Sequence, residues 1–181
     1  MVTVASDATA IPAHYSSKTF KIVAACFFLS GATGLVYEVL WARMLGLVFG
    51  ATTLAVSTVL AAFMGGLALG SALAGKFGEK LKRPVLAYGL LELCVAIYAI
   101  AVPILFRLVD HLYVFIWQHF HPSFFAFSIW RFVLSCALLL IPTTLMGATL
   151  PVLSAALMRS RYGVTSVTRL YTRNLAGAIA G

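Results

Sequence analysis

Charged side chains are scarce in this chain. Aspartate, glutamate, lysine and arginine make up 10% of its 181 residues, whereas hydrophobic residues make up 62%. Soluble domains carry about 25% charged residues, so the composition excludes an ordinary soluble domain and predicts a polytopic membrane protein. The net charge of +8 does not indicate nucleic-acid binding, because the basic residues lie at the ends of apolar runs and form no continuous face.

Cysteine pairs and catalytic motifs are also absent from the sequence. Cys26, Cys94 and Cys136 lie in three different apolar runs, and none forms a CxxC. They are therefore expected to be small packing residues, without a disulfide framework or a zinc site. The sequence has no glycine-rich nucleotide loop after a strand, no HExxH and no hydrolase-like arrangement of serine, histidine and aspartate. The sequence therefore gives no motif from which an enzyme activity could be predicted, and we expect no cofactor and no metal.

Long uncharged runs are the main feature that the chain does have. Residues 51–75 contain no charge and are followed directly by a basic run at 76–84. A helix of this length crosses a ~30 Å hydrocarbon core at ~1.5 Å per residue. Small residues recur in it at every fourth position and predict a flat face against which another helix packs; they are Ala62, Gly66, Gly70 and Ala74.

The same criteria along the whole chain predict an all-α, polytopic helical membrane protein with four complete spans and the start of a fifth. Residues 1–19 are expected to form a cytoplasmic tail, and 20–181 the transmembrane helical domain. The spans are expected at 20–41, 51–75, 85–108 and from 124 towards 158, with 175–181 opening the fifth.

Breaks are expected where a run is too long for one straight crossing. A break or an interfacial piece is predicted within 43–50. Another is predicted in the fourth span, kinked or interrupted at Pro142, Gly147 and Pro151. The aromatic segment 110–123 is expected to lie at the outer interface, where tryptophan and tyrosine favour the headgroup level.

Most basic residues fall on one side of this layout, which places the N-terminus and the 76–84 loop in the cytoplasm by the positive-inside rule. The start of the chain is similar to a signal peptide, but apolar character resumes after Gly34, so we predict an uncleaved span. The expected location is the inner (plasma) membrane, with several crossings.

Three ionisable residues within the spans are candidates for substrate or ion binding. Glu38 shares a helical face with the small residues Gly31, Gly34 and Ala42. An acid on such a face points at a neighbouring helix. It is either the partner of Arg43 or Arg131 in a structural ion pair, or part of a proton or cation site.

Glu92 is the second candidate, and Arg131 is the third. Glu92 shares its face with Gly89, Ala96 and Ala99, so it too is expected between helices, in structural hydrogen bonding or in a substrate or proton role. Arg131 is expected to pair with Glu38 or to extend outward to the interface.

Histidines cluster in the outer segment at positions 111, 119 and 121. His119 and His121 would share a face only in an extended chain. An interfacial loop is the simpler expectation for His111, His119 and His121, and no metal site is predicted.

Several segments together resemble the membrane domain of fused spermidine synthase-like proteins. They are residues 30–50, 59–75, 83–93, 141–157 and 170–181. The most specific piece is PTTLMGATLP at 142–151. In that family a helical membrane region related to the major facilitator pattern precedes a cytoplasmic aminopropyltransferase domain. That catalytic domain is absent here, so no catalytic residue is transferred, and the chain is expected to be a truncated relative or part of a longer protein.

Three functions follow from these observations as alternatives. The first is a membrane interaction or accessory module, which packs through its small-residue faces with other membrane subunits or with copies of itself. The second is a domain that binds or transports a polyamine or another small cation through Glu38 and Glu92. The third is the membrane part of an aminopropyltransferase. The expected partners are the lipid bilayer and other membrane subunits or a homo-oligomer, without nucleic acid.

Overall fold

Helices make up nearly all of the described structure, because a helix satisfies its backbone polar groups within one apolar segment. The structure is a computed structural model that describes residues 17–49, 53–78, 80–120, 123–158 and 163–181. Its helices in this part of the chain are α1 (Ser17–Phe49), α2 (Thr53–Gly78), α3 (Pro84–Phe120), α4 (Phe124–Met158) and α5 (Gly163–Ala180). Most of the predicted tail lies outside the described residues.

Four of these helices are long and apolar enough to cross a membrane. The candidate spans are Ser17–Met44, Val59–Gly78, Pro84–His119 and Phe132–Met158. The prediction of an all-helical chain with four long apolar segments is therefore confirmed. Large apolar side chains remain exposed along these helices, Ile100 to 78% for example. An apolar surface of this extent suits hydrocarbon surroundings and not water.

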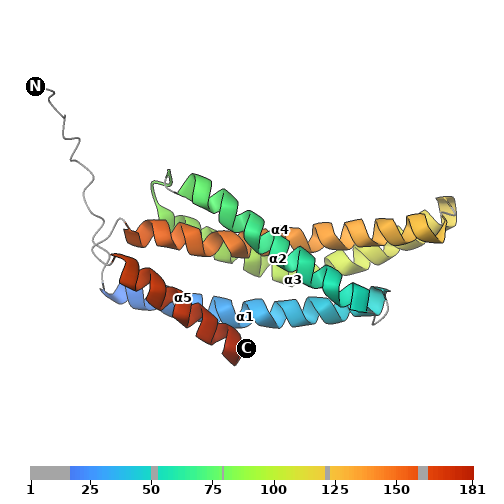
Figure 1. The fold of residues 1–181 in the computed structure, drawn as a ribbon. Coiled ribbons are helices and arrows are strands. Elements are labelled where there is room, and N and C mark those ends of the chain that lie inside the picture. Colours follow the sequence, from blue (N-terminus) through green and yellow to red (C-terminus); the bar gives the residue numbers. More distant parts are fainter. Residues whose placement is uncertain (1–16, 50–52, 79, 121–122, 159–162) are drawn as a thin grey trace, which may run out of the picture.

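The helices pack as two close pairs joined by further contacts (Figure 1). α2 lies along α4, α5 lies along α1, and α3 packs on α4. α5 crosses α1 and ends partway along it, where Gly181 lies against Ala32 (Figure 1). α2 and α4 run in the same direction, because Gly66 faces Thr143 while Gly70 faces Ala148.

Close backbone approach joins α2 to α4. A Cβ atom at Gly66 would overlap the Thr143 hydroxyl, and one at Gly70 would overlap the carbonyl of Thr144. A Cβ atom at Gly147 of α4 would overlap the backbone of Leu67 in return. Small residues at such a crossing let the two backbones approach closely. The small-residue face of α2, on which Ala62 and Ala74 are also buried, thus packs inside this chain.

The same kind of contact holds α5 on α1. A Cβ atom at Gly31 would overlap the Asn174 carbonyl, and one at Gly177 would overlap the Phe28 carbonyl. The Asn174 side-chain amide Nδ2 donates a hydrogen bond to the Phe27 carbonyl at 2.9 Å. A Cβ atom at Gly34 would meet nothing within 4 Å, so of the two glycines expected to pack, only Gly31 touches another helix in the described structure.

Of the two alternatives expected for the fourth span, a kink or an interruption, the interruption does not occur, because α4 is one continuous helix through Pro142, Gly147 and Pro151. A proline in a helix leaves the carbonyl four residues earlier without its N–H donor. Hydroxyl groups of neighbouring helices replace both donors. Tyr98 of α3 donates to the Leu138 carbonyl at 2.7 Å, and Ser71 of α2 donates to the Gly147 carbonyl at 2.9 Å.

α1 continues through most of the 43–50 range and ends at Phe49, so the end of this helix lies within the range where a break was expected. The outer segment, expected as an interfacial loop over 110–123, is helical up to Phe120, and α4 starts at Phe124. No glycine or proline stands between Pro103 and Phe120 to end the helix, whereas Pro122 disfavours a helical residue before it. The far ends of α3 and α4 therefore extend together beyond those of α1 and α2 (Figure 1).

Two clusters of buried side chains stabilise the bundle, one near each end. The first brings Phe27 of α1, Tyr88 of α3 and Leu153 of α4 together with Leu170 of α5. The second contains aromatic side chains of three helices, and its members include Trp41, Phe63, Phe106 and Leu139. The first cluster positions the candidate site, because Tyr88 belongs to it.

Candidate polar site between α1 and α3

Two polar atoms within the bundle are buried without a hydrogen-bond partner among the described residues. They are the Tyr88 hydroxyl and the Oε1 atom of Glu92. Residues four apart lie one above the other on a helix, so the two side chains belong to the same face of α3. Buried polar atoms are normally hydrogen-bonded, and each exception requires an explanation.

α1 supplies the opposite wall of this site. The edge of the Phe27 ring packs against the Tyr88 ring, with centroids 6.0 Å apart and planes at 73°. Ser30 lies beside Glu92, and Cys26 lies beside Tyr88. The spacing of Cys26, Phe27 and Ser30 at i, i+1 and i+4 presents one side of α1 to α3.

The packing explains why this site forms where it does. Tyr88 is 4% exposed, and its ring is held by the cluster that also contains Leu153 and Leu157 of α4. Its hydroxyl is therefore fixed at the edge of that cluster, next to the carboxyl of Glu92. The arrangement offers the oxygen atoms of three side chains, a carboxylate, a phenol and the Ser30 hydroxyl, in apolar surroundings. Such a set can accept hydrogen bonds from a group with several N–H donors.

Glu38 does not join this site. It lies eight residues beyond Ser30 on α1, which corresponds to about 12 Å along the helix axis. Its side chain is partly buried, and no ion pair joins it to Arg43 in the described structure, where the Arg43 side chain is exposed. The two intramembrane acids of the sequence prediction thus belong to separate places.

Arg131 is remote from Glu92. The hydrogen bond from Tyr98 to the Leu138 carbonyl fixes the register of α3 against α4. Since the two helices are antiparallel, Glu92 and Arg131 lie on opposite sides of that bond, about 20 Å apart along the bundle at the helical rise per residue. The side chain of Arg131 lies outside the described part of the chain.

The outer histidines bind their own helix. His111 Nδ1 lies 2.6 Å from the Arg107 carbonyl oxygen, and His119 Nδ1 lies 3.0 Å from that of Phe115, on whose ring it stacks. His121 lies outside the described residues. Within the described ranges no group of three histidine, cysteine, aspartate or glutamate side chains is placed to hold a metal ion. Cys26, Cys94 and Cys136 are free thiols there, on three different helices.

The sequence interpretation did not include Tyr88 and Ser30 in the site. Tyr88 precedes Glu92 by four residues, so the helical period already placed it on the same face. Ser30 had no such signal, because its proximity to Glu92 depends on how α1 packs against α3.

Comparison of the chain with models of protein families, with curated proteins and with solved structures finds no match. The resemblance to the spermidine synthase-like membrane domain therefore stays a prediction from the sequence segments.

Proposed function

We propose that this chain is a membrane-embedded helical domain that binds a small organic cation through Glu92, Tyr88 and Ser30. In this proposal α1 to α4 cross the inner membrane, and the N-terminus and the loop between α2 and α3 face the cytoplasm. Four candidate spans, an apolar exterior and the distribution of lysine and arginine support this placement.

One observation is the main support for cation binding. Oε1 of Glu92 and the hydroxyl of Tyr88 are buried side by side on α3, and neither makes a hydrogen bond of normal geometry among the described residues, although Tyr88 and Ser30 both lie close enough to interact with the Glu92 carboxyl group. Leaving a buried polar group unsatisfied costs about 1–3 kcal/mol, and more if it is charged. A ligand that supplies the missing hydrogen bonds and a positive charge would remove this cost.

A primary ammonium group matches the chemistry of the site. It has three N–H donors, and three side chains of the site have oxygen atoms that can accept them. Intramembrane acids commonly mark ion or substrate sites. A polyamine is the substrate class suggested by the family resemblance, and it contains such groups at both ends.

Equilibrium binding of radiolabelled spermidine to the detergent-purified protein tests this function. We expect saturable binding with one site per chain, and at least about tenfold weaker binding for Glu92→Gln, since a hydrogen bond to a charged group contributes about 1.5–3 kcal/mol. Glu38→Gln is the matched control, because it neutralises the other partly buried acid outside the site. Equal affinity of the wild type and a folded Glu92→Gln variant would refute the proposal.

A second candidate function, an accessory module in a larger membrane assembly, is favoured by the open face of α1 at Gly34. A Cβ atom there would meet nothing within 4 Å, and Glu38 lies one helical turn further along. The small-residue face of α2 does not support such a role, because α4 of the same chain occupies it. Oxidative cross-linking of a Gly34→Cys variant in membranes tests it. Specific cross-links would support assembly, and a monomer that cross-links only at random would oppose it.

A further inference from the structure

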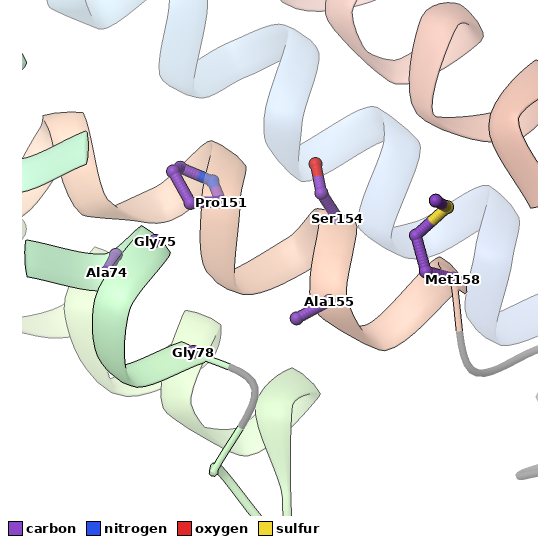
Figure 2. Close-up of a pocket in the computed structure, with 7 residues that line it drawn as sticks. All are labelled: Ala74, Gly75, Gly78, Pro151, Ser154, Ala155 and Met158. Carbon is purple, nitrogen blue, oxygen red and sulfur yellow. The ribbon is translucent and has the colours of Figure 1, made fainter. Parts of the chain in front are cut away.

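A cavity of about 620 Å³ opens between the end of α2 and the last turns of α4. Figure 2 shows the small residues Gly75 and Gly78 of α2 on one side of it and Pro151, Ala155 and Met158 of α4 on the other. Ligand sites in proteins commonly measure about 300–1,000 Å³, so this groove is large enough to hold part of a molecule.

The groove exists because α2 and α4 separate towards these ends. At Gly66 and Gly70 the two helices are in direct backbone contact. At Gly78 a Cβ atom would be 3.9 Å from both Ala155 and Pro151, and at Gly75 it would meet nothing within 4 Å. Small side chains on both walls leave the resulting space unfilled.

Basic residues stand in the last turn of α2 and directly after it, next to this groove along the chain. Lys80 N–H donates to the Phe77 carbonyl at 3.0 Å, and Leu81 N–H donates to the Gly78 carbonyl at 3.2 Å, which folds the chain back directly after the groove. The exposed basic side chains in and next to this turn are Lys76, Lys80, Lys82 and Arg83. The run contains one acid, Glu79, so its net charge is positive.

We propose that an anionic phospholipid occupies this groove. An acyl chain lies against Gly75, Gly78 and Ala155, and the phosphate lies near Lys80 and Lys82. The inference uses the membrane placement proposed above and is independent of the cation site at Glu92. In that placement the groove faces the cytoplasmic leaflet, where anionic lipids attract basic residues near the surface. An apolar groove with a basic end has the two properties that such a lipid requires.

Native mass spectrometry of the full chain, titrated with phosphatidylglycerol or phosphatidylcholine, tests the proposal. We expect tighter binding of phosphatidylglycerol, and about tenfold weaker binding of it to Gly75→Leu, whose side chain would fill the groove. Gly65→Leu is the matched control. It introduces the same side chain on the same helix, where a Cβ atom also meets nothing within 4 Å, but outside the groove lining. Lys80→Gln combined with Lys82→Gln should reduce the preference for phosphatidylglycerol and leave binding of phosphatidylcholine unchanged.

Three results would overturn the lipid site. They are equal binding of the two lipids to the wild type, wild-type binding by Gly75→Leu, and displacement of the lipid by inorganic phosphate alone, which would indicate a site for free phosphate. Extraction of the protein from membranes with carbonate, before any detergent is added, tests the membrane placement separately. A protein that resists carbonate but shows no lipid preference would refute the groove proposal only, and the spermidine assay would be unaffected.

Discussion

Ser71 of α2 donates a hydrogen bond to the carbonyl oxygen of Gly147 in α4, at 2.9 Å. That carbonyl is the one from which Pro151 removes the usual amide donor, because Pro151 lies four residues further along the helix. Tyr98 of α3 likewise donates a hydrogen bond to the Leu138 carbonyl, which lacks its usual amide donor because of Pro142 four residues later. Two neighbouring helices thus replace the two hydrogen bonds that α4 cannot make for itself.

Replacement of Ser71 by alanine should destabilise the protein only while Pro151 is present. Ser71→Ala leaves the Gly147 carbonyl without a donor, and we expect a loss of about 1–3 kcal/mol. In a Pro151→Ala background the new N–H can bond to Gly147, so the same change should cost much less. Thermal unfolding in detergent of the four proteins of this double-mutant cycle measures the coupling. Additive effects would contradict the proposed exchange of donors.

Tyr98→Phe should show the same dependence on Pro142. The ring is retained, so packing changes little, and the loss comes from the Leu138 carbonyl. We expect about 1 kcal/mol or more of destabilisation, largely removed by Pro142→Ala. Tyr113→Phe is the comparison. It removes a hydroxyl from another buried tyrosine of α3, and its effect should not depend on residue 142. If Tyr98→Phe cost the same stability with proline and with alanine at position 142, Tyr98 would not be the substitute donor for the Leu138 carbonyl.

Replacement by alanine should have opposite effects on stability at two glycines of α2, Gly70 and Gly65. Gly70→Ala places a Cβ atom on the Thr144 carbonyl, and overpacking of this kind typically costs about 1–3 kcal/mol. Gly65→Ala meets no neighbour and should stabilise the helix by about 0.5–1 kcal/mol, since alanine has the higher helix propensity. The melting temperatures of the two variants in the same detergent give the comparison. Similar behaviour of both would mean that α2 does not approach α4 as described.

Removal of the unpartnered hydroxyl at Tyr88 should separate stability from binding. Tyr88→Phe keeps the ring against Phe27 and removes a buried group without a partner, so the ligand-free protein should become more stable, by about 1 kcal/mol. Spermidine should raise the unfolding free energy of the wild type by about 2.7 kcal/mol at one hundred times its dissociation constant, and by clearly less in Tyr88→Phe.

The control for that experiment is the Glu38→Gln variant, in which spermidine should stabilise the protein as in the wild type. A scanning fluorescence melt with and without spermidine is sufficient. If Tyr88→Phe lost stability in the absence of ligand, the hydroxyl would have a structural partner and the cation site would need to be abandoned.

The helices themselves were predictable from local features of the sequence. The uncharged length of 51–75 and the basic run after it indicated α2 and its end, and similar runs indicated the other long helices. Boundaries were less predictable. The aromatic composition of 110–123 suggested an interfacial loop, but nothing in it stops a helix before Pro122.

The candidate site could be predicted only in part. Glu92 stood out because an acid in an apolar run is costly, and Tyr88 shares its face by helical period. Ser30, some sixty residues earlier in the chain, could be found only from the packing of α1 against α3. The expected pairing of Glu38 with Arg131 stays a prediction, because the Arg131 side chain lies outside the described residues. The register of α3 against α4 keeps Glu92 apart from Arg131 along the bundle.

What the sequence alone determined is the secondary structure class and the long apolar helices, because helix length and polarity depend on consecutive residues. What only the tertiary structure decided is which groups meet. Prolines at 142 and 151 predict a broken helix when α4 is considered by itself. The helix is continuous because Tyr98 and Ser71, on two other helices, supply the missing donors. The partner of a buried polar atom is set by helix crossing and register, which are properties of the whole bundle and are not contained in any single segment.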